Sequence, residues 1–208
     1  MNICIYSSSS NSIAPVYAEE AEQLALLIGE NGHTLINGGA NVGLMHQLLA
    51  SASRAGAKTI GVIPEKLNRF NLGSPHAGKL IVSSDMMERK AVMRKLADAF
   101  IALPGGFGTL EEILEVITLK QLDYHNKAVV FLNTNGFFND LFRQFERSFS
   151  EQFARPGYRQ LYHIASSATK TMEYLSTYIP PAPLKKWHDA RGETASREQG
   201  QKNSGLQK

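Results

Sequence analysis

The sequence predicts an α/β fold: a doubly wound, mostly parallel, Rossmann-like sheet in a single domain. Short apolar strands alternate with amphipathic helices along the chain, a pattern typical of parallel sheets covered by helices on both faces. Residues 99–103 (Ala-Phe-Ile-Ala-Leu) form a continuous apolar run of the kind that is buried on both sides. Polar segments rich in Gly or Ser follow several strands, which is where such sheets bind ligands.

Short apolar runs predict seven strands, at 2–6, 34–36, 59–63, 80–82, 99–103, 128–132 and 162–165. Helical spacing of apolar residues predicts six helices, at 14–31, 42–55, 85–98, 109–122, 138–153 and 168–178. Gly32 and Gly56 can end the first two helices, and Pro64 closes the third strand. Asp85 can cap the third predicted helix, at 85–98. Residues 65–78 lack periodicity and are expected to form a loop.

Composition excludes several classes of protein. The single cysteine, Cys4, rules out an intramolecular disulfide framework and a Cys-rich zinc site. No apolar run approaches the ~20 residues that span a membrane. The first six residues have the pattern of a strand rather than of a signal peptide. We therefore expect a cytoplasmic protein with no membrane association.

The net charge of +3 is concentrated at the C-terminal end. Residues 185–208 contain six basic and three acidic residues, which leaves 16 of each sign in residues 1–184. This segment follows a proline-rich stretch at 180–183 and is polar, so we expect a domain at 1–180 and a disordered basic tail at 181–208. Because the body is neutral, we expect no binding to nucleic acid.

Three strand-end segments can hold an anion: residues 7–10, 38–43 and 104–109. Glycines let backbone N–H groups approach a phosphate closely near a helix N-terminus. The segments do not match a Walker A loop or the dinucleotide pattern Gly-x-Gly-x-x-Gly. Because the carboxyl ends of parallel strands meet at one edge, the three segments together indicate a nucleotide or phosphate site.

Two charged clusters near these segments allow two interpretations each. Thr109 and Glu112 have the spacing of a capping box at a helix start, which the spacing alone favours, and they could instead share the anion pocket. Arg89 and Lys90 could belong to a solvated helix face, or they could turn inward, where Arg binds phosphate bidentately.

Several motifs of the sequence resemble those of a known family. Residues 103–112 (Leu-Pro-Gly-Gly-Phe-Gly-Thr-Leu-Glu-Glu) match the Pro-Gly-Gly-x-Gly-Thr-x-x-Glu signature of the LONELY GUY (LOG) family of cytokinin riboside 5′-monophosphate phosphoribohydrolases. Residues 85–90 (Asp-Met-Met-Glu-Arg-Lys) resemble its Asp-Met-x-x-Arg-Lys motif, and 38–45 resemble its Gly-Gly-x-x-x-Gly-Leu-Met. Residues 61–64 and 115–118 also fit, so the resemblance spans residues 2–179.

The resemblance implies hydrolysis of the N-glycosidic bond of an N6-substituted adenosine monophosphate, giving free base and ribose 5-phosphate. It implies that Arg89 and Glu112 are catalytic. It also implies a substrate-binding set from the matched motifs: Ser8, Gly38, Gly39, Arg89, Lys90, Gly105, Gly106, Phe107, Gly108, Thr109, Leu110, Glu111 and Thr118. No metal or cofactor is required, and a homodimer with a nucleoside 5′-monophosphate as substrate is expected.

The chemistry is consistent with these roles. Breaking a ribosyl C–N bond develops positive charge on the sugar, which a carboxylate such as Glu112 can stabilise while it orients water. Arg89 could hold the phosphate or assist the departing base. Ser7 stands where the family commonly has Gly, His46 where it often has Gly, and Asn71 where it has Glu, so we expect substrate preference to differ around residues 65–78.

The sequence leaves three alternative functions open. A broader purine nucleoside-monophosphate glycosidase is the nearest. A non-catalytic protein that binds a nucleotide or molybdenum cofactor is the second, since fold does not fix function. A lysine decarboxylase, an old label of the family, would need a pyridoxal phosphate Schiff-base lysine, for which no Lys is placed by mechanism.

Overall fold

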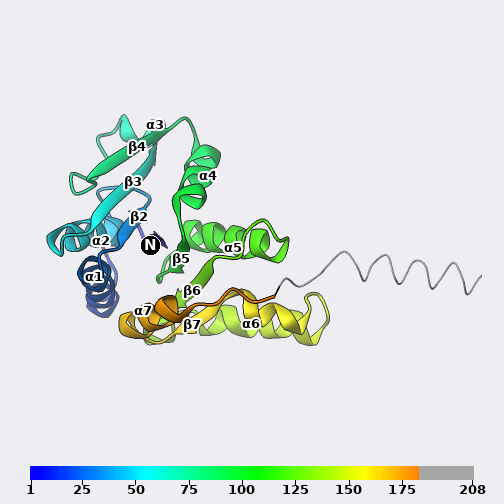
Figure 1. Cartoon of the computed structure of the whole chain (residues 1–208). Coiled ribbons are helices and arrows are strands. Elements are labelled where there is room, and N and C mark those ends of the chain that lie inside the picture. The colour runs from blue at the N-terminus through cyan, green and yellow to red at the C-terminus, as the bar shows by residue number, and fades with distance from the viewer. Residues whose placement is uncertain (183–208) are drawn as a thin grey trace, which may run out of the picture.

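One parallel sheet lies at the centre of the computed structural model, which describes residues 1–182 (Figure 1). Its strand order is β4-β3-β2-β1-β5-β6-β7, and every neighbouring pair is parallel. The strands are β1 (Asn2–Tyr6), β2 (Thr34–Asn37), β3 (Lys58–Pro64), β4 (Lys79–Ser83), β5 (Ala99–Ala102), β6 (Ala128–Leu132) and β7 (His163–Ala165). The order reverses between β1 and β5, which defines the switch point where such sheets bind ligands. The predicted fold class is confirmed.

Helices cover both faces of the sheet because each inner strand buries alternate side chains on opposite sides. On β1, Ile3 and Ile5 join one core with α1 (Pro15–Glu30), α2 (Gly43–Arg54) and α7 (Ala168–Thr177). Cys4 and Tyr6 join the other core with α4 (Met86–Leu96), α5 (Phe107–Gln121) and α6 (Asn139–Ser150). Figure 1 shows α1 and α2 on one side of the central strands and α4 and α5 on the other. The sheet is therefore doubly wound.

All seven predicted strands and six predicted helices occur, with ends shifted by a few residues. Gly32 and Gly56 have positive φ of 66° and 82°, which glycine adopts readily, and each follows the C-cap residue of its helix, α1 or α2. The Asp85 carboxylate accepts a hydrogen bond from the Glu88 N–H at 2.8 Å, which confirms the predicted cap of α4.

Three short helices were not predicted: α3 (Glu65–Asn68), η1 (Thr134–Gly136) and η2 (Pro156–Leu161). The prediction of a loop throughout residues 65–78 is therefore wrong at its start. A helix of four residues is too short to show apolar periodicity; α3 directly follows Pro64, and an exposed Arg69–Glu65 ion pair at 2.7 Å spans it. The predicted basic tail lies outside the described residues except for positions 181 and 182.

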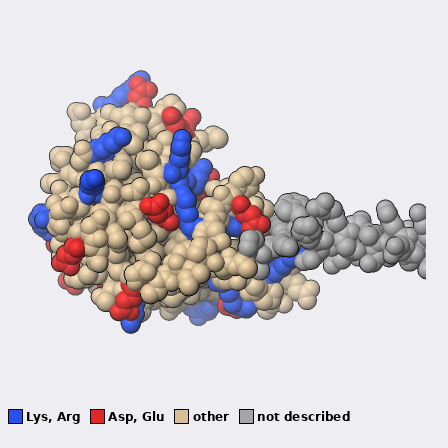
Figure 2. All heavy atoms as spheres, viewed as in Figure 1, with Lys and Arg blue, Asp and Glu red and all other residues tan. Residues whose placement is uncertain are grey.

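On the face seen in Figure 2, basic and acidic side chains lie interspersed among uncharged ones. This mixture agrees with the equal numbers of the two signs in residues 1–184. Among residues 1–182, the helices are too short or too polar to cross a membrane.

Candidate active site

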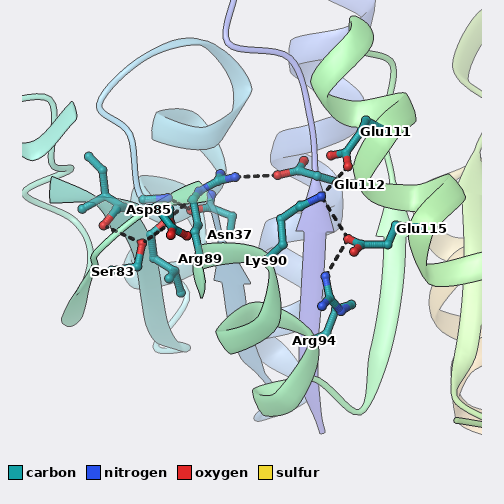
Figure 3. A network of polar contacts seen from close by, with 12 residues as sticks. Asn37, Ser83, Asp85, Arg89, Lys90, Arg94, Glu111, Glu112 and Glu115 are labelled. Atoms are coloured by element: carbon teal, nitrogen blue, oxygen red, sulfur yellow. Dashed lines mark hydrogen bonds and ion pairs between the residues drawn. The ribbon is translucent and has the colours of Figure 1, made fainter. Parts of the chain in front are cut away.

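A buried ion pair joins α4 to α5 at the carboxyl edge of the sheet. The Arg89 Nη1 donates to the Glu112 Oε1 at 2.6 Å, and the two residues are 7% and 8% exposed (Figure 3). The Arg89 Nε donates to the Val62 carbonyl at 2.9 Å, which fixes the guanidinium against β3. Arg89 therefore turns inward, and its interpretation as part of a solvated face is wrong.

Gly38 makes room for this arginine. A Cβ on Gly38 would lie 2.0 Å from the Arg89 Nη2 and 2.8 Å from the Met45 Sδ. Gly39 has a positive φ of 69° and lies against the backbone of Gly61 and Val62. Within the described chain, Gly38 thus serves first to admit the guanidinium to the edge of the sheet, rather than to cradle an anion with its own backbone.

Asn37 holds the same loop in shape, although its sequence context did not mark it. Its side chain is fully buried, donates to the Met45 carbonyl at 2.9 Å and accepts from the Gly39 N–H at 2.9 Å. Both bonds fix the turn between β2 and α2. A buried amide satisfied by backbone groups on both sides is a rigid support for the neighbouring Arg89.

The capping box predicted from Thr109 and Glu112 is wrong. Helix α5 begins at Phe107, with Gly106 as its N-cap and without a side-chain cap among the described residues. Thr109 therefore already lies in the first turn, and Glu112 lies in the second turn, too far along the helix to cap it. This start leaves the Glu112 carboxylate directed to Arg89, and the first N–H groups of α5 have no side-chain acceptor in that region.

The three predicted anion segments converge at the switch point. A Cβ on Gly105 would lie 2.1 Å from the Thr109 Oγ1 and 3.1 Å from the Ser8 backbone N, so the loops after β1 and β5 touch at this glycine. The Leu44 N–H donates to the Ser8 carbonyl at 3.0 Å, which joins the loops after β1 and β2. The expectation that the three loops meet at one edge is confirmed.

Burial and charge act in opposite directions on Glu112. Burial raises the pKa of its carboxyl above the ordinary value, and the Arg89 guanidinium opposes that shift by its charge and by its hydrogen bond. Glu111 raises the pKa further and Lys90 lowers it. Because the Glu112 carboxylate is poorly hydrated, the low local dielectric strengthens its interaction with a positive charge that develops nearby.

Lys90 and Glu111 form an ion pair with each other beside Arg89 and Glu112 (Figure 3). The Lys90 Nζ also lies 3.3 Å from Glu115, and Glu115 pairs with Arg94 at 2.6 Å. The hydrogen bond to Glu111 raises the pKa of Lys90, so the ammonium stays charged. The network ties α4 to α5 along the side that carries the buried pair.

The remaining predicted residues differ in position. Gly106 and Gly108 face open space, Phe107 is 92% exposed, and Leu110 is partly buried against the core of α4 and α5. Thr118 lies two turns beyond Glu112, exposed, with its hydroxyl donating to the Leu114 carbonyl at 2.8 Å. Within one chain, the structure does not bring Thr118 together with the buried pair.

A crevice of about 260 Å³ opens at the switch point. Its walls come from the loops after β1, β5 and β6 and from the start of α1: Ser8, Ile13, Tyr17, Pro104, Gly105, Gly106 and Phe137. Sequence reasoning missed Ile13, Tyr17 and Phe137, because only the fold brings them to this place. A larger cavity, of about 550 Å³, lies around Phe149 and Tyr158 beyond the C-terminal half of α6, away from the buried pair.

The segment after α3 is attached to the Gly-rich loop. The Ser74 N–H donates to the Gly39 carbonyl at 2.8 Å, and the Asn41 N–H donates to the Leu72 carbonyl at 2.7 Å. Asn71, which departs from the family pattern, is exposed at the outer turn of this segment with a positive φ of 55°. Residues 71–74 thus border the loop that admits Arg89.

The sequence of this chain is similar to a known family and to known plant proteins. A family model described as "Possible lysine decarboxylase" matches residues 45–175. The chain is 39% identical over 178 residues to the cytokinin riboside 5′-monophosphate phosphoribohydrolase LOG7 of Arabidopsis thaliana, covering 86% of this chain and 82% of that one. It is 38% identical to LOG2 of the same plant, covering 86% and 84%.

Solved structures show the same fold. The molybdenum cofactor binding protein of Rippkaea orientalis superposes with a TM-score of 0.66 at 26% identity, covering 85% of this chain and 95% of that one. The molybdenum cofactor carrier protein of Chlamydomonas reinhardtii superposes with a TM-score of 0.65 at 22% identity, covering 84% and 95%. The family model and the plant relatives, matched over most of their length, show that this chain belongs to the LOG family.

Proposed function

We propose that this protein hydrolyses the N-glycosidic bond of N6-substituted adenosine 5′-monophosphates, and of AMP, to free base and ribose 5-phosphate. The observation that carries the proposal is the buried Arg89–Glu112 pair, 2.6 Å apart, at the same edge of the sheet as the crevice of about 260 Å³ at the switch point. The relatives named for this reaction support it.

The first step is capture of the 5′-phosphate. The N-terminus of α5 offers backbone N–H groups and the positive end of its dipole at Gly106 and Phe107. The Thr109 hydroxyl lies beside Gly105 at the same turn and can donate to a phosphate oxygen. Binding the non-reacting phosphate here fixes the ribose, so that binding energy positions the reacting carbon.

Glu112 then acts on the anomeric carbon. It lies on α5 nearly two turns along from the phosphate loop, on the side of β2 and β3. As the C–N bond breaks, the ribose becomes positively charged, and the buried carboxylate stabilises that charge where water is scarce. The same carboxylate can orient the attacking water and accept its proton.

Arg89 has two tasks in this proposal. Its guanidinium favours the ionised form of Glu112 against the effect of burial, and its Nη2 lies at Gly38, where it can donate to the departing base or to the ribose. The bond to the Val62 carbonyl and the glycine beneath it restrict the guanidinium to one position. Restricting a catalytic group in this way lowers the reorganisation needed in the transition state.

We further infer a homodimer whose interface lies next to the site. Phe107 and Met87, in the first turns of α5 and α4, are 92% and 78% exposed on the same two helices that carry the buried pair. Large apolar side chains exposed around a polar centre are typical of an interface. Thr118, which points away from the pair in its own chain, can then contribute to the site of a second copy.

A substrate panel tests the reaction. The protein is incubated with N6-isopentenyl-AMP, AMP, GMP, CMP and the unphosphorylated ribosides, and free base is measured by chromatography. We expect release from the two adenosine monophosphates and at least about tenfold slower release from the ribosides, because they lack the anchoring phosphate. Equal release from ribosides and monophosphates would contradict the role of the α5 loop, and release from GMP at the rate of AMP would favour a broader purine glycosidase.

A further inference from the structure

The crevice at the switch point extends past the phosphate loop to an apolar end. Ser8, Gly105 and Gly106 form its polar part, which faces the N-terminus of α5. Beyond them lie Tyr17 of α1 and Phe137, which directly follows η1. The crevice therefore continues on the side of α1 and β6, whereas Arg89 and Glu112 lie on the side of β2 and β3.

The two aromatic rings are held in place by the fold. Their centroids are 5.9 Å apart in an edge-to-face arrangement, and Phe137 packs edge-to-face on the fully buried Phe138 at 5.1 Å. The Phe138 N–H donates to the Asn133 side chain at 2.8 Å, and the Phe137 N–H donates to the Thr134 carbonyl at 3.1 Å. A tight turn thus presents Phe137 to Tyr17 as a fixed surface.

The two ends of the crevice differ in the groups that they offer to a phosphate. A phosphate at the α5 N-terminus finds backbone N–H donors and the Thr109 hydroxyl. The residues that line the crevice include no Lys, Arg or His. A second phosphate, directed away from Glu112, would meet the rings of Tyr17 and Phe137 with no cation to balance its charge.

We propose that Tyr17 and Phe137 form an apolar end wall that limits the nucleotide to a single 5′-phosphate. The proposal rests on the proposed function, because it takes the reacting carbon to lie at Glu112 and the 5′ end of the nucleotide to point away from it. It assigns to these two residues the discrimination between monophosphate and diphosphate substrates.

A charge introduced into the wall tests the assignment. The variants are Phe137→Lys, which places an ammonium at the apolar end, and Phe153→Lys, a matched change at a residue that is 83% exposed and lies at the other cavity. For each protein, kcat/KM is measured on N6-isopentenyl-AMP and on the corresponding 5′-diphosphate. The ratio of the two values reports discrimination independently of overall activity.

We expect the unmodified protein to favour the monophosphate by about tenfold or more, because a second phosphate would lose part of its hydration against these rings, of which Phe137 is 45% exposed, without a cation to pair with. Phe137→Lys should reduce that ratio at least about tenfold by pairing with the second phosphate, and Phe153→Lys should leave it unchanged. A diphosphate cleaved as well as the monophosphate by the unmodified protein, or an unchanged ratio in Phe137→Lys, would overturn the proposal.

The outcome is separable from that of the proposed function. If the unmodified protein cleaves neither nucleotide, the proposed function fails, and calorimetric titration with AMP and ADP then tests the wall by binding alone. Tighter binding of AMP, reversed or reduced in Phe137→Lys, would support it, and equal binding would overturn it. Tyr17→Arg supplies the cation from the opposite wall should Phe137→Lys not fold.

Discussion

Replacing Gly38 with alanine should disable the site while leaving the fold intact. The new Cβ would lie 2.0 Å from the Arg89 Nη2, whereas ordinary contacts of this kind are 3.4–4 Å, so the guanidinium must move by more than about 1 Å. That movement breaks the 2.6 Å bond to Glu112. A displacement of about 1 Å in a catalytic group typically costs about 100-fold in rate, or about 2.7 kcal/mol of transition-state stabilisation.

The assay compares kcat/KM on N6-isopentenyl-AMP for the unmodified protein, Gly38→Ala and the control Gly78→Ala. A Cβ on Gly78 would lie 3.4 Å from the Thr59 Oγ1, an ordinary contact remote from the site, so the control should retain activity. Thermal melting checks that Gly38→Ala is folded. Activity of a folded Gly38→Ala protein within threefold of the control would refute the view that Gly38 exists to admit Arg89.

Three further predictions concern buried ionisable groups. Glu112→Gln should lower kcat about 100-fold or more with a smaller change in KM, measured by steady-state kinetics, since the carboxylate acts mainly in the transition state. Activity that needs this carboxylate is lost as pH falls through its pKa; because burial raises that pKa, the acid limb of the kcat–pH profile should lie above the range of an exposed glutamate. A limb at or below that range would contradict this reading. Burial lowers the pKa of Lys120 to about 8, below the ~10.4 of an unfolded chain, so between these values the unfolded state binds more protons and stability rises with pH. The Tm of the unmodified protein should therefore rise relative to that of Lys120→Met between pH 8 and pH 10, and a constant difference would show that Lys120 does not titrate there.

The sequence was sufficient for the architecture. The strands are continuous apolar runs, and the longer helices have apolar residues at helical spacing, so the hydrophobic pattern of the sequence identifies both. The alternation of strands and helices predicts that the strands are parallel. The meeting of the three glycine- and serine-rich loops followed as well, since parallel strands place their carboxyl ends at one edge. The family motifs identified Arg89 and Glu112, whose pairing the structure shows.

The spacing of Thr109 and Glu112 did not predict the role of Glu112, because that role depends on the residue at which α5 begins. Thr109 and Glu112 have the separation of a capping box, yet the N-cap of α5 lies three residues earlier, at Gly106, which takes the extended N-cap conformation. That shift moves Glu112 from the first turn to the second and frees it for Arg89. No propensity separates two such registers of one helix.

Other features depend on contacts between distant segments. Gly38 has the pattern of an anion-binding glycine, and its tight approach to Arg89 becomes visible only when α4 is placed over β3. Tyr17 and Phe137 come together from segments that are 120 residues apart in the sequence. Lys90 was expected at the substrate, and its pairing with Glu111 depends on how α4 lies beside α5.

We propose that the buried Arg89–Glu112 pair makes this member of the fold a hydrolase rather than a carrier. The most direct measurement is the amount of ribose 5-phosphate formed when the unmodified protein is incubated with a large excess of N6-isopentenyl-AMP. We expect many equivalents of ribose 5-phosphate per protein chain, matched by equal amounts of free base, and almost none with Glu112→Gln. Nucleotide that binds and is recovered intact from the unmodified protein would contradict it.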